Sequence, residues 1–131
     1  MSRKADLVRA WLLKAEHDLE SSRILIRDEK RLLDVAVYHC QQAGEKALKA
    51  YLTEHDTIFP KTHELGELLN LCLPTNHDFE RLRHHAETLS PLAHQFRYPG
   101  DAVEPSAGEA AEALRMAEEI YYFCQEQLAS E

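Results

Sequence analysis

Apolar and small residues recur at alternating spacings of three and four along three long stretches of the sequence, and this pattern constrains the fold most. Such spacings place the residues on one stripe of an α-helix. Only four glycines and five prolines are present, which leaves little turn chemistry for an all-β fold. We therefore expect long helices over about 6–29, 34–54 and 106–128. Their stripes are Val8, Leu12, Ala15, Leu19, Ser22 and Ile26; Val37, Cys40, Gly44, Ala47 and Tyr51; and Ala110, Leu114, Ala117, Tyr121, Cys124 and Leu128.

The stretch between the second and third segments predicts two further helices. A loop is expected over 56–62, because Pro60 disfavours helix in the residue before it. A short helix should follow over about 63–73. A longer helix should run from about 75 to 95, and Pro91 should kink it or divide it in two.

Capping residues mark three helix starts. Asp34 can cap the second segment, and Thr75 with Asp78 and Ser106 with Glu109 have the spacing of a capping box. The segments together predict an all-α fold, an antiparallel up-and-down bundle of four long helices plus one short helix. A length of 131 residues suits a single domain.

Composition indicates where the chain is located and which large partners it does not contact. The formal charge of −8 argues against coating a polyanion without sequence preference. No run approaches the ~20 apolar residues of a membrane span, and the N-terminus is polar, so we expect a cytoplasmic protein without membrane contact. Three widely spaced cysteines, Cys40, Cys72 and Cys124, fit reduced and buried thiols better than a disulfide framework.

The charge is distributed unevenly along the chain. Residues 104–131 hold seven glutamates and one arginine, a net charge of −6. This acidity fits either a solvated outer face of the last helix or a contact with a basic partner. Residues 81–98 are locally positive, because Arg81, Arg83 and Arg97 are opposed only by Glu87.

A search for catalytic motifs excludes several enzyme classes. The sequence has no Walker loop, no GxGxxG and no GxSxG. His63 does not begin an HExxH motif, and His84 and His85 are adjacent and diverge on a helix. We therefore predict no catalytic residue, no metal site and no bound cofactor.

One polar stripe lies on the second predicted helix. His39, Gln42, Lys46 and Lys49 recur at three, four and three, so they share one face over about three turns. The stripe is either solvated surface or a site for an anion such as phosphate. A Glu45–Lys49 pair at i, i+4 would neutralise part of it.

A second polar signal follows the predicted helix that ends near residue 95. Arg97, Tyr98 and Pro99 place a guanidinium, an aromatic ring and a rigid turn side by side. They can clamp a base or phosphate, or they can lock the loop against the bundle.

Four motifs in order resemble those of the HEPN domain, a nucleotide-binding domain of higher eukaryotes and prokaryotes. They are WLLKAEHDLE (11–20), YHCQQAGEKALKAYL (38–52), THELGELL (62–69) and RYP (97–99), and the likeness extends from about residue 5 to 127. The resemblance implies an up-and-down helical bundle and a homodimer. It also implies a separately encoded minimal nucleotidyltransferase as partner, often in a toxin–antitoxin pair.

The resemblance is to the branch of this family that lacks the nuclease motif. Many HEPN proteins are metal-independent ribonucleases that carry an Arg followed, after four to six residues, by a His. Here seven residues separate Arg9 from His17 and Arg31 from His39, and no histidine follows Arg97. We therefore expect a module that binds a nucleotide, ATP or GTP, or a short RNA or a protein partner.

The residues that the resemblance assigns to ligand binding lie in four parts of the chain. Two other functions remain open: a ribonuclease with a non-standard site, in which a histidine works with Arg97 across a dimer interface, and a structural dimerisation module without ligand. The histidines of the first alternative are His39, His84, His85 and His94. The candidate ligand-binding residues are Asp18; Tyr38, Gln41, Gln42, Glu45, Lys46 and Lys49; His63; and Arg97 and Tyr98, to which the stripe adds His39.

Overall fold

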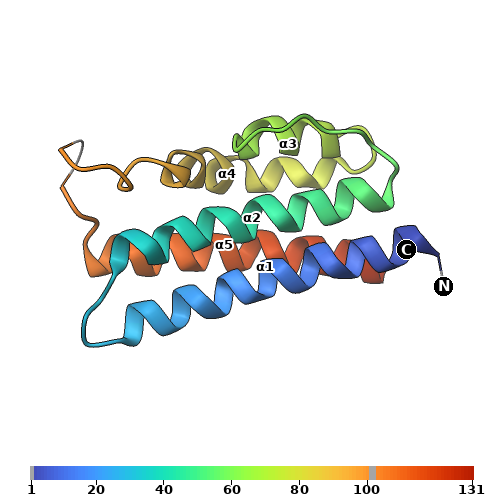
Figure 1. The fold of residues 1–131 in the computed structure, drawn as a ribbon. Helices are drawn as coiled ribbons and strands as arrows, with labels where there is room; N and C mark the ends of the chain where they lie inside the picture. Colours follow the sequence, from blue (N-terminus) through green and yellow to red (C-terminus); the bar gives the residue numbers. More distant parts are fainter. Residues whose placement is uncertain (1, 101–102) are drawn as a thin grey trace.

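The computed structural model describes residues 2–100 and 103–131, and within these ranges the chain is helical without strands. Three helices are long, with 25, 22 and 23 residues. The first two long helices, the shorter segment at 77–93 and the third long helix follow one another along the chain. Each runs antiparallel to the one before it (Figure 1). This confirms the predicted all-α, up-and-down bundle. The elements are α1 (Arg3–Arg27), α2 (Leu33–Glu54), α3 (Leu65–Cys72), the 3₁₀ helix η1 (His77–Leu82), α4 (Arg83–Leu89), the 3₁₀ helix η2 (Ser90–Ala93) and α5 (Ala107–Ala129).

Helix α2 lies at the centre of the bundle, with α1 and α5 on one side and the α3–α4 layer on the other (Figure 1). Its apolar faces are lined by small residues, and Ala36, Ala43, Ala47 and Ala50 are fully buried. A Cβ at Gly44 would lie 3.1 Å from Leu65 Cδ1 and 3.5 Å from Ile120 Cδ1. Helices on both sides therefore approach α2 as closely as its small side chains allow.

The fourth arm is divided near Pro91, as predicted, but its parts are not α-helical throughout. It consists of η1, the seven-residue α4 and η2, and η2 begins with Ser90 and Pro91. Pro91 has no N–H for a helical hydrogen bond. Ser90 Oγ donates to the Ala86 carbonyl and accepts from the Leu65 N–H, both at 2.8 Å, so the break is tied to the start of α3.

Two of the predicted caps are wrong. Helix α2 begins at Leu33 without a side-chain cap, and Asp34 lies in its first turn. Asn76, not Thr75, caps η1, because its side chain accepts from the Asp78 N–H at 2.9 Å while the Thr75 hydroxyl donates to the Cys72 carbonyl. The capping box of Ser106 and Glu109 is present at the start of α5 as predicted.

The three cysteines are buried and form no disulfide bond with one another. Burial raises the pKa of Cys40 and of Cys72 to about 12, so neither thiol ionises at neutral pH. In the part of the chain that the structure describes, no helix combines the length and the apolar character needed to cross a membrane.

We expect Gly44→Leu to lower the free energy of unfolding by about 1–3 kcal/mol, because the added side chain overpacks the contact between α2, α3 and α5. Gly66→Leu is the matched control, since a Cβ there meets only the flexible Arg83 guanidinium at 3.9 Å. We expect no loss of stability from it. Urea unfolding of both variants measures the difference, and equal losses would contradict the close approach at α2.

Candidate functional site

A buried carboxylate, Asp18, joins α1 to the polar stripe of α2. It is 6% exposed and accepts hydrogen bonds from His39 Nδ1 and Lys46 Nζ, each at 2.7 Å. A buried charge without partners is costly, so Asp18 requires both donors. Because a carboxylate only accepts, His39 must carry its proton on Nδ1 in this pair, which leaves Nε2 as the basic nitrogen.

A second buried carboxylate, Glu45, organises the other end of the stripe. Its oxygens accept from Lys49 Nζ at 2.9 Å, His63 Nδ1 at 2.9 Å and Gln41 Nε2 at 3.1 Å. Gln41 Nε2 also donates to the His63 carbonyl at 2.9 Å, and Gln42 donates to Gln41 Oε1 at 2.8 Å. These bonds fasten the end of the loop that follows α2 to the middle of that helix.

Aromatic rings cover the cation of this second cluster. Lys49 Nζ lies 5.5 Å from the ring centroids of both Trp11 and Phe59, and the side chain is 12% exposed. Trp11 and Phe59 meet edge to face at 6.4 Å. Lys49 is therefore held by Glu45 and by two rings, and it does not project toward solvent.

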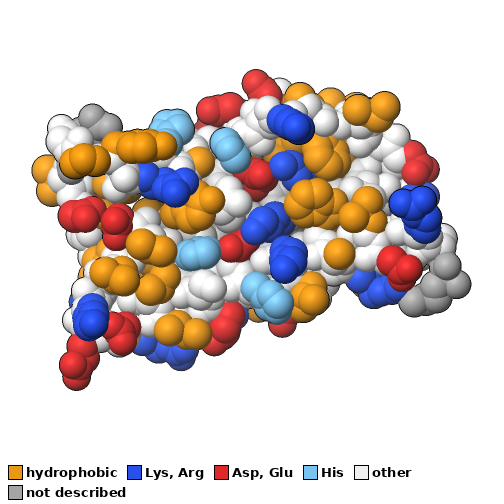
Figure 2. All heavy atoms as spheres, in the orientation of Figure 1, with side chains coloured by type: hydrophobic (Ala, Val, Ile, Leu, Met, Phe, Trp, Pro, Cys, Tyr) orange, Lys and Arg blue, Asp and Glu red, His pale blue; other side chains and the backbone are white. Residues whose placement is uncertain are grey.

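Both lysines of the polar stripe of α2 are thus paired with carboxylates. Lys46 is neutralised by Asp18 and Lys49 by Glu45, the second of which is the i, i+4 pair that the sequence suggests. Figure 2 shows Lys or Arg, Asp or Glu, and His side chains gathered in the middle of one face, between hydrophobic areas. An anion that met only this stripe would find little net positive charge.

A shallow depression lies beside the first cluster, where the turn after η2 crosses the start of α2. It has a volume of about 290 Å³ and is lined by Asp34, Val35, Tyr38, His39 and Arg97. The Arg97 guanidinium lies 4.4 Å from the centroid of the Tyr38 ring. Within residues 2–100 and 103–131, no carboxylate forms an ion pair with Arg97.

The structure divides the candidate residues predicted from sequence into two connected groups. Tyr98, which is 63% exposed, lies next to the depression in sequence but has no ring partner among the described residues. Sequence reasoning missed Asp34, although its spacing of four from Tyr38 places both on one face of α2. The first group is Asp18, Tyr38, His39, Lys46 and Arg97, and the second is Gln41, Gln42, Glu45, Lys49 and His63.

Among the described residues, His39 is the only histidine that lines this depression. His85 Nε2 bonds to Glu119 in a separate depression that Arg81 and Phe123 also line. Within the two described ranges, no three His, Cys, Asp or Glu side chains are arranged to hold a metal ion.

Comparison with known proteins places this geometry in a family. The model of the HEPN domain matches residues 8–127. The chain belongs to the HEPN domain family. Of the solved HEPN-like structures, an archaeal HEPN homologue, ST0689, is 25% identical with a TM-score of 0.70, covering 97% of this chain and 98% of its own. The protein TT1696 from Thermus thermophilus is 28% identical with a TM-score of 0.72, covering 91% and 96%.

No curated protein matches this HEPN domain. The family match spans both polar clusters and the Arg97 turn, so all the candidate residues lie inside the HEPN domain.

We expect Glu45→Gln to make the free energy of unfolding change less with pH in the acidic range. Burial alone raises the pKa of Glu45, but hydrogen bonds from His63, Lys49 and Gln41 outweigh it and lower the pKa below its ordinary value. A carboxylate with a lowered pKa stabilises the fold above the ordinary Glu pKa of about 4.3, and this stability is lost as pH falls through the folded pKa.

Urea unfolding across pH measures this effect. The difference between the unmodified chain and Glu45→Gln should be about 1–3 kcal/mol near neutral pH and should shrink below about pH 4. Glu54→Gln, on the same helix and without an ion pair among the described residues, serves as the control. A difference for Glu45→Gln that stayed constant with pH would contradict the assigned role.

Proposed function

We propose that this HEPN domain binds the phosphate of a nucleotide, ATP or GTP, or of a short RNA, in the depression between α2 and the Arg97 turn. The observation that carries the proposal is the Arg97 guanidinium stacked on Tyr38 without an ion pair among the described residues. Stacking holds the guanidinium plane, so its N–H groups are pre-oriented for a bidentate contact with phosphate oxygens.

Neighbouring groups suit the rest of a nucleotide. Asp34 can accept hydrogen bonds from ribose hydroxyls, and the exposed Tyr98 ring can stack on a base. A volume of about 290 Å³ is at the lower end of ligand sites, which fits a phosphate and sugar better than an enclosed nucleotide. Stacking tolerates any base, so the arrangement does not select between ATP and GTP.

The two clusters support the site indirectly in this proposal. Glu45, Gln41 and His63 fix the loop after α2, and Lys46 helps hold Asp18, which orients His39 toward the depression. Lys46 and Lys49 then hold the site in shape and do not themselves neutralise the ligand.

Isothermal titration calorimetry with ATP, GTP and a short RNA tests this function. We expect Arg97→Ala to weaken binding by about 10–100-fold, because a charged hydrogen-bonded contact contributes about 1.5–3 kcal/mol. Arg81→Ala is the matched control, since Arg81 lies over the Phe123 ring at 5.7 Å outside the depression. No heat with any ligand, or equal losses in the two variants, would disprove the proposal.

A second candidate function is favoured by one observation. The Asp18–His39 pair presents an oriented imidazole to the same depression that holds Arg97, within one chain. An imidazole that exchanges protons and a guanidinium that stabilises developing negative charge are the groups that metal-independent RNA cleavage needs. This arrangement makes His39, rather than His84, His85 or His94, the residue to examine.

Incubation of labelled RNA in EDTA separates the two functions. If the site is a ribonuclease, His39→Ala and Asp18→Asn should each reduce cleavage by about 100-fold or more, and His85→Ala should not. If the site only binds RNA, cleavage stays at the background level in every variant, and His39→Ala changes the binding affinity alone.

We further propose that this HEPN domain forms a homodimer and acts with a separately encoded minimal nucleotidyltransferase, as in a toxin–antitoxin pair. Membership of the family supports both proposals. A structural dimerisation module without ligand is the alternative. Light scattering gives the oligomeric state, and the neighbouring gene shows whether such a partner is encoded.

A further inference from the structure

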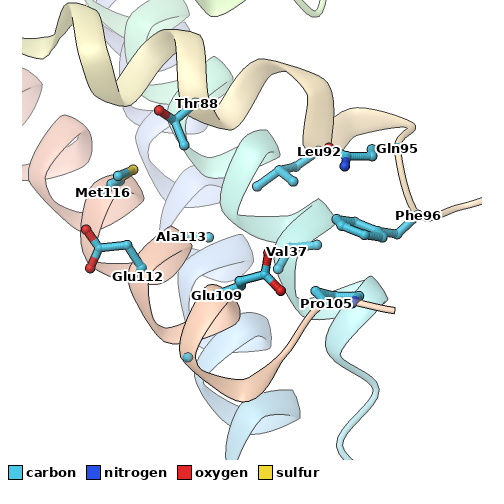
Figure 3. A pocket seen from close by; sticks show the side chains of 11 residues that line it. Val37, Thr88, Leu92, Gln95, Phe96, Pro105, Glu109, Glu112, Ala113 and Met116 are labelled. Carbon is cyan, nitrogen blue, oxygen red and sulfur yellow. The ribbon is translucent and has the colours of Figure 1, made fainter. Parts of the chain in front are cut away.

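An apolar groove lies between α5 and the segment formed by α4 and η2. It has a volume of about 410 Å³, within the range of ligand and peptide sites. Figure 3 shows Leu92 and Phe96 on one side, Ala113 and Met116 on the other, and Val37 of α2 at the base. The groove plays no part in the proposed nucleotide site.

The walls of the groove differ in charge. The α5 wall carries Glu109 and Glu112, whereas the opposite wall contributes the uncharged Thr88 and Gln95. Glu112 pairs with Arg115, but Glu109 has no basic partner in the described parts of the chain. It accepts only from the Ser106 N–H, at 2.8 Å.

Glu109 and Glu112 are the acids that line the groove, and the other acids of α5 lie outside its lining. Glu118 pairs with Arg23 and Glu119 with Arg115, so the net charge of −6 over residues 104–131 is spread beyond the groove. A negative wall repels phosphate groups and attracts Lys and Arg side chains. The groove is therefore unsuited to nucleic acid, and a second copy of this acidic helix would be repelled from it.

We propose that this groove docks a basic amphipathic helix of a partner protein. Apolar side chains at spacings of three and four would insert between Leu92, Phe96 and Met116, and Lys or Arg at the edge would meet Glu109 and Glu112. Charge complementarity selects this occupant over an acidic helix of the same hydrophobicity.

A library of displayed peptides tests the proposal on the full chain. Peptides of about 15 residues, long enough for a helix, keep leucines on one face and vary the remaining positions among Lys, Glu, Gln and Ser. NMR of the isotope-labelled protein then locates an enriched peptide on the surface. We expect enriched peptides to be rich in lysine and to shift signals of Val37, Ala113 and Met116.

Two variants with matched controls decide whether the groove is the site. Thr88→Trp places a large side chain at the mouth of the groove from an exposed position. Glu112→Lys replaces an acidic side chain of the α5 wall by a basic one. Each should weaken binding at least about tenfold. Glu87→Trp, next to Thr88 but outside the groove lining, and Glu126→Lys, farther along α5, should bind nearly as tightly as the unmodified chain.

Three outcomes would overturn the proposal. They are enrichment without a preference for lysine, shifts confined to another surface, and a change of oligomeric state by Thr88→Trp, which would assign the groove to a second copy of the chain. Circular dichroism confirms that each variant is folded. ATP binding measured on the same proteins distinguishes this failure from failure of the nucleotide site, because the groove variants do not touch Arg97 or Tyr38.

Discussion

The need to pair two buried carboxylates, Asp18 and Glu45, governs most of the polar structure. A carboxylate removed from water is costly unless several donors surround it. Asp18 takes its donors from His39 and Lys46, and Glu45 takes its donors from Gln41, Lys49 and His63. These bonds set the register of α1 against α2 and fix the loop after α2. They also fix which nitrogen of His39 is left for the depression.

The sequence predicted the helices best where many residues act together. Helices α1, α2 and α5 each extend over more than five turns, so one exception does not disturb the pattern of their stripes. The fourth arm depends on a few local choices, namely Pro91, the back-bonded Ser90 and the Asn76 cap. Tertiary contacts such as the Ser90–Leu65 hydrogen bond also contribute, and these cannot be read from local spacing.

The candidate site was predictable only in its short-range parts. The Glu45–Lys49 pair follows from a spacing of four, and it is present. Lys46 and Asp18 are 28 residues apart, so only the packing of α1 on α2 reveals that Lys46 is neutralised. The contact of Arg97 with Tyr38 likewise depends on the path of the turn after η2. Long-range contacts therefore distinguish Lys46, which is paired within the fold, from Arg97, which lines the depression.

Two pairs of neighbouring residues explain how one small domain keeps the groove and the depression apart. Val37 and Phe96 line the apolar groove, whereas the next residues along the chain, Tyr38 and Arg97, line the depression. Successive residues of a helix point about 100° apart, so α2 serves both surfaces from adjacent positions. The turn after η2 does the same for Phe96 and Arg97. The net charge of −8 therefore describes neither surface, because residues 104–131 carry −6 of it, whereas the depression holds Arg97 beside Asp34.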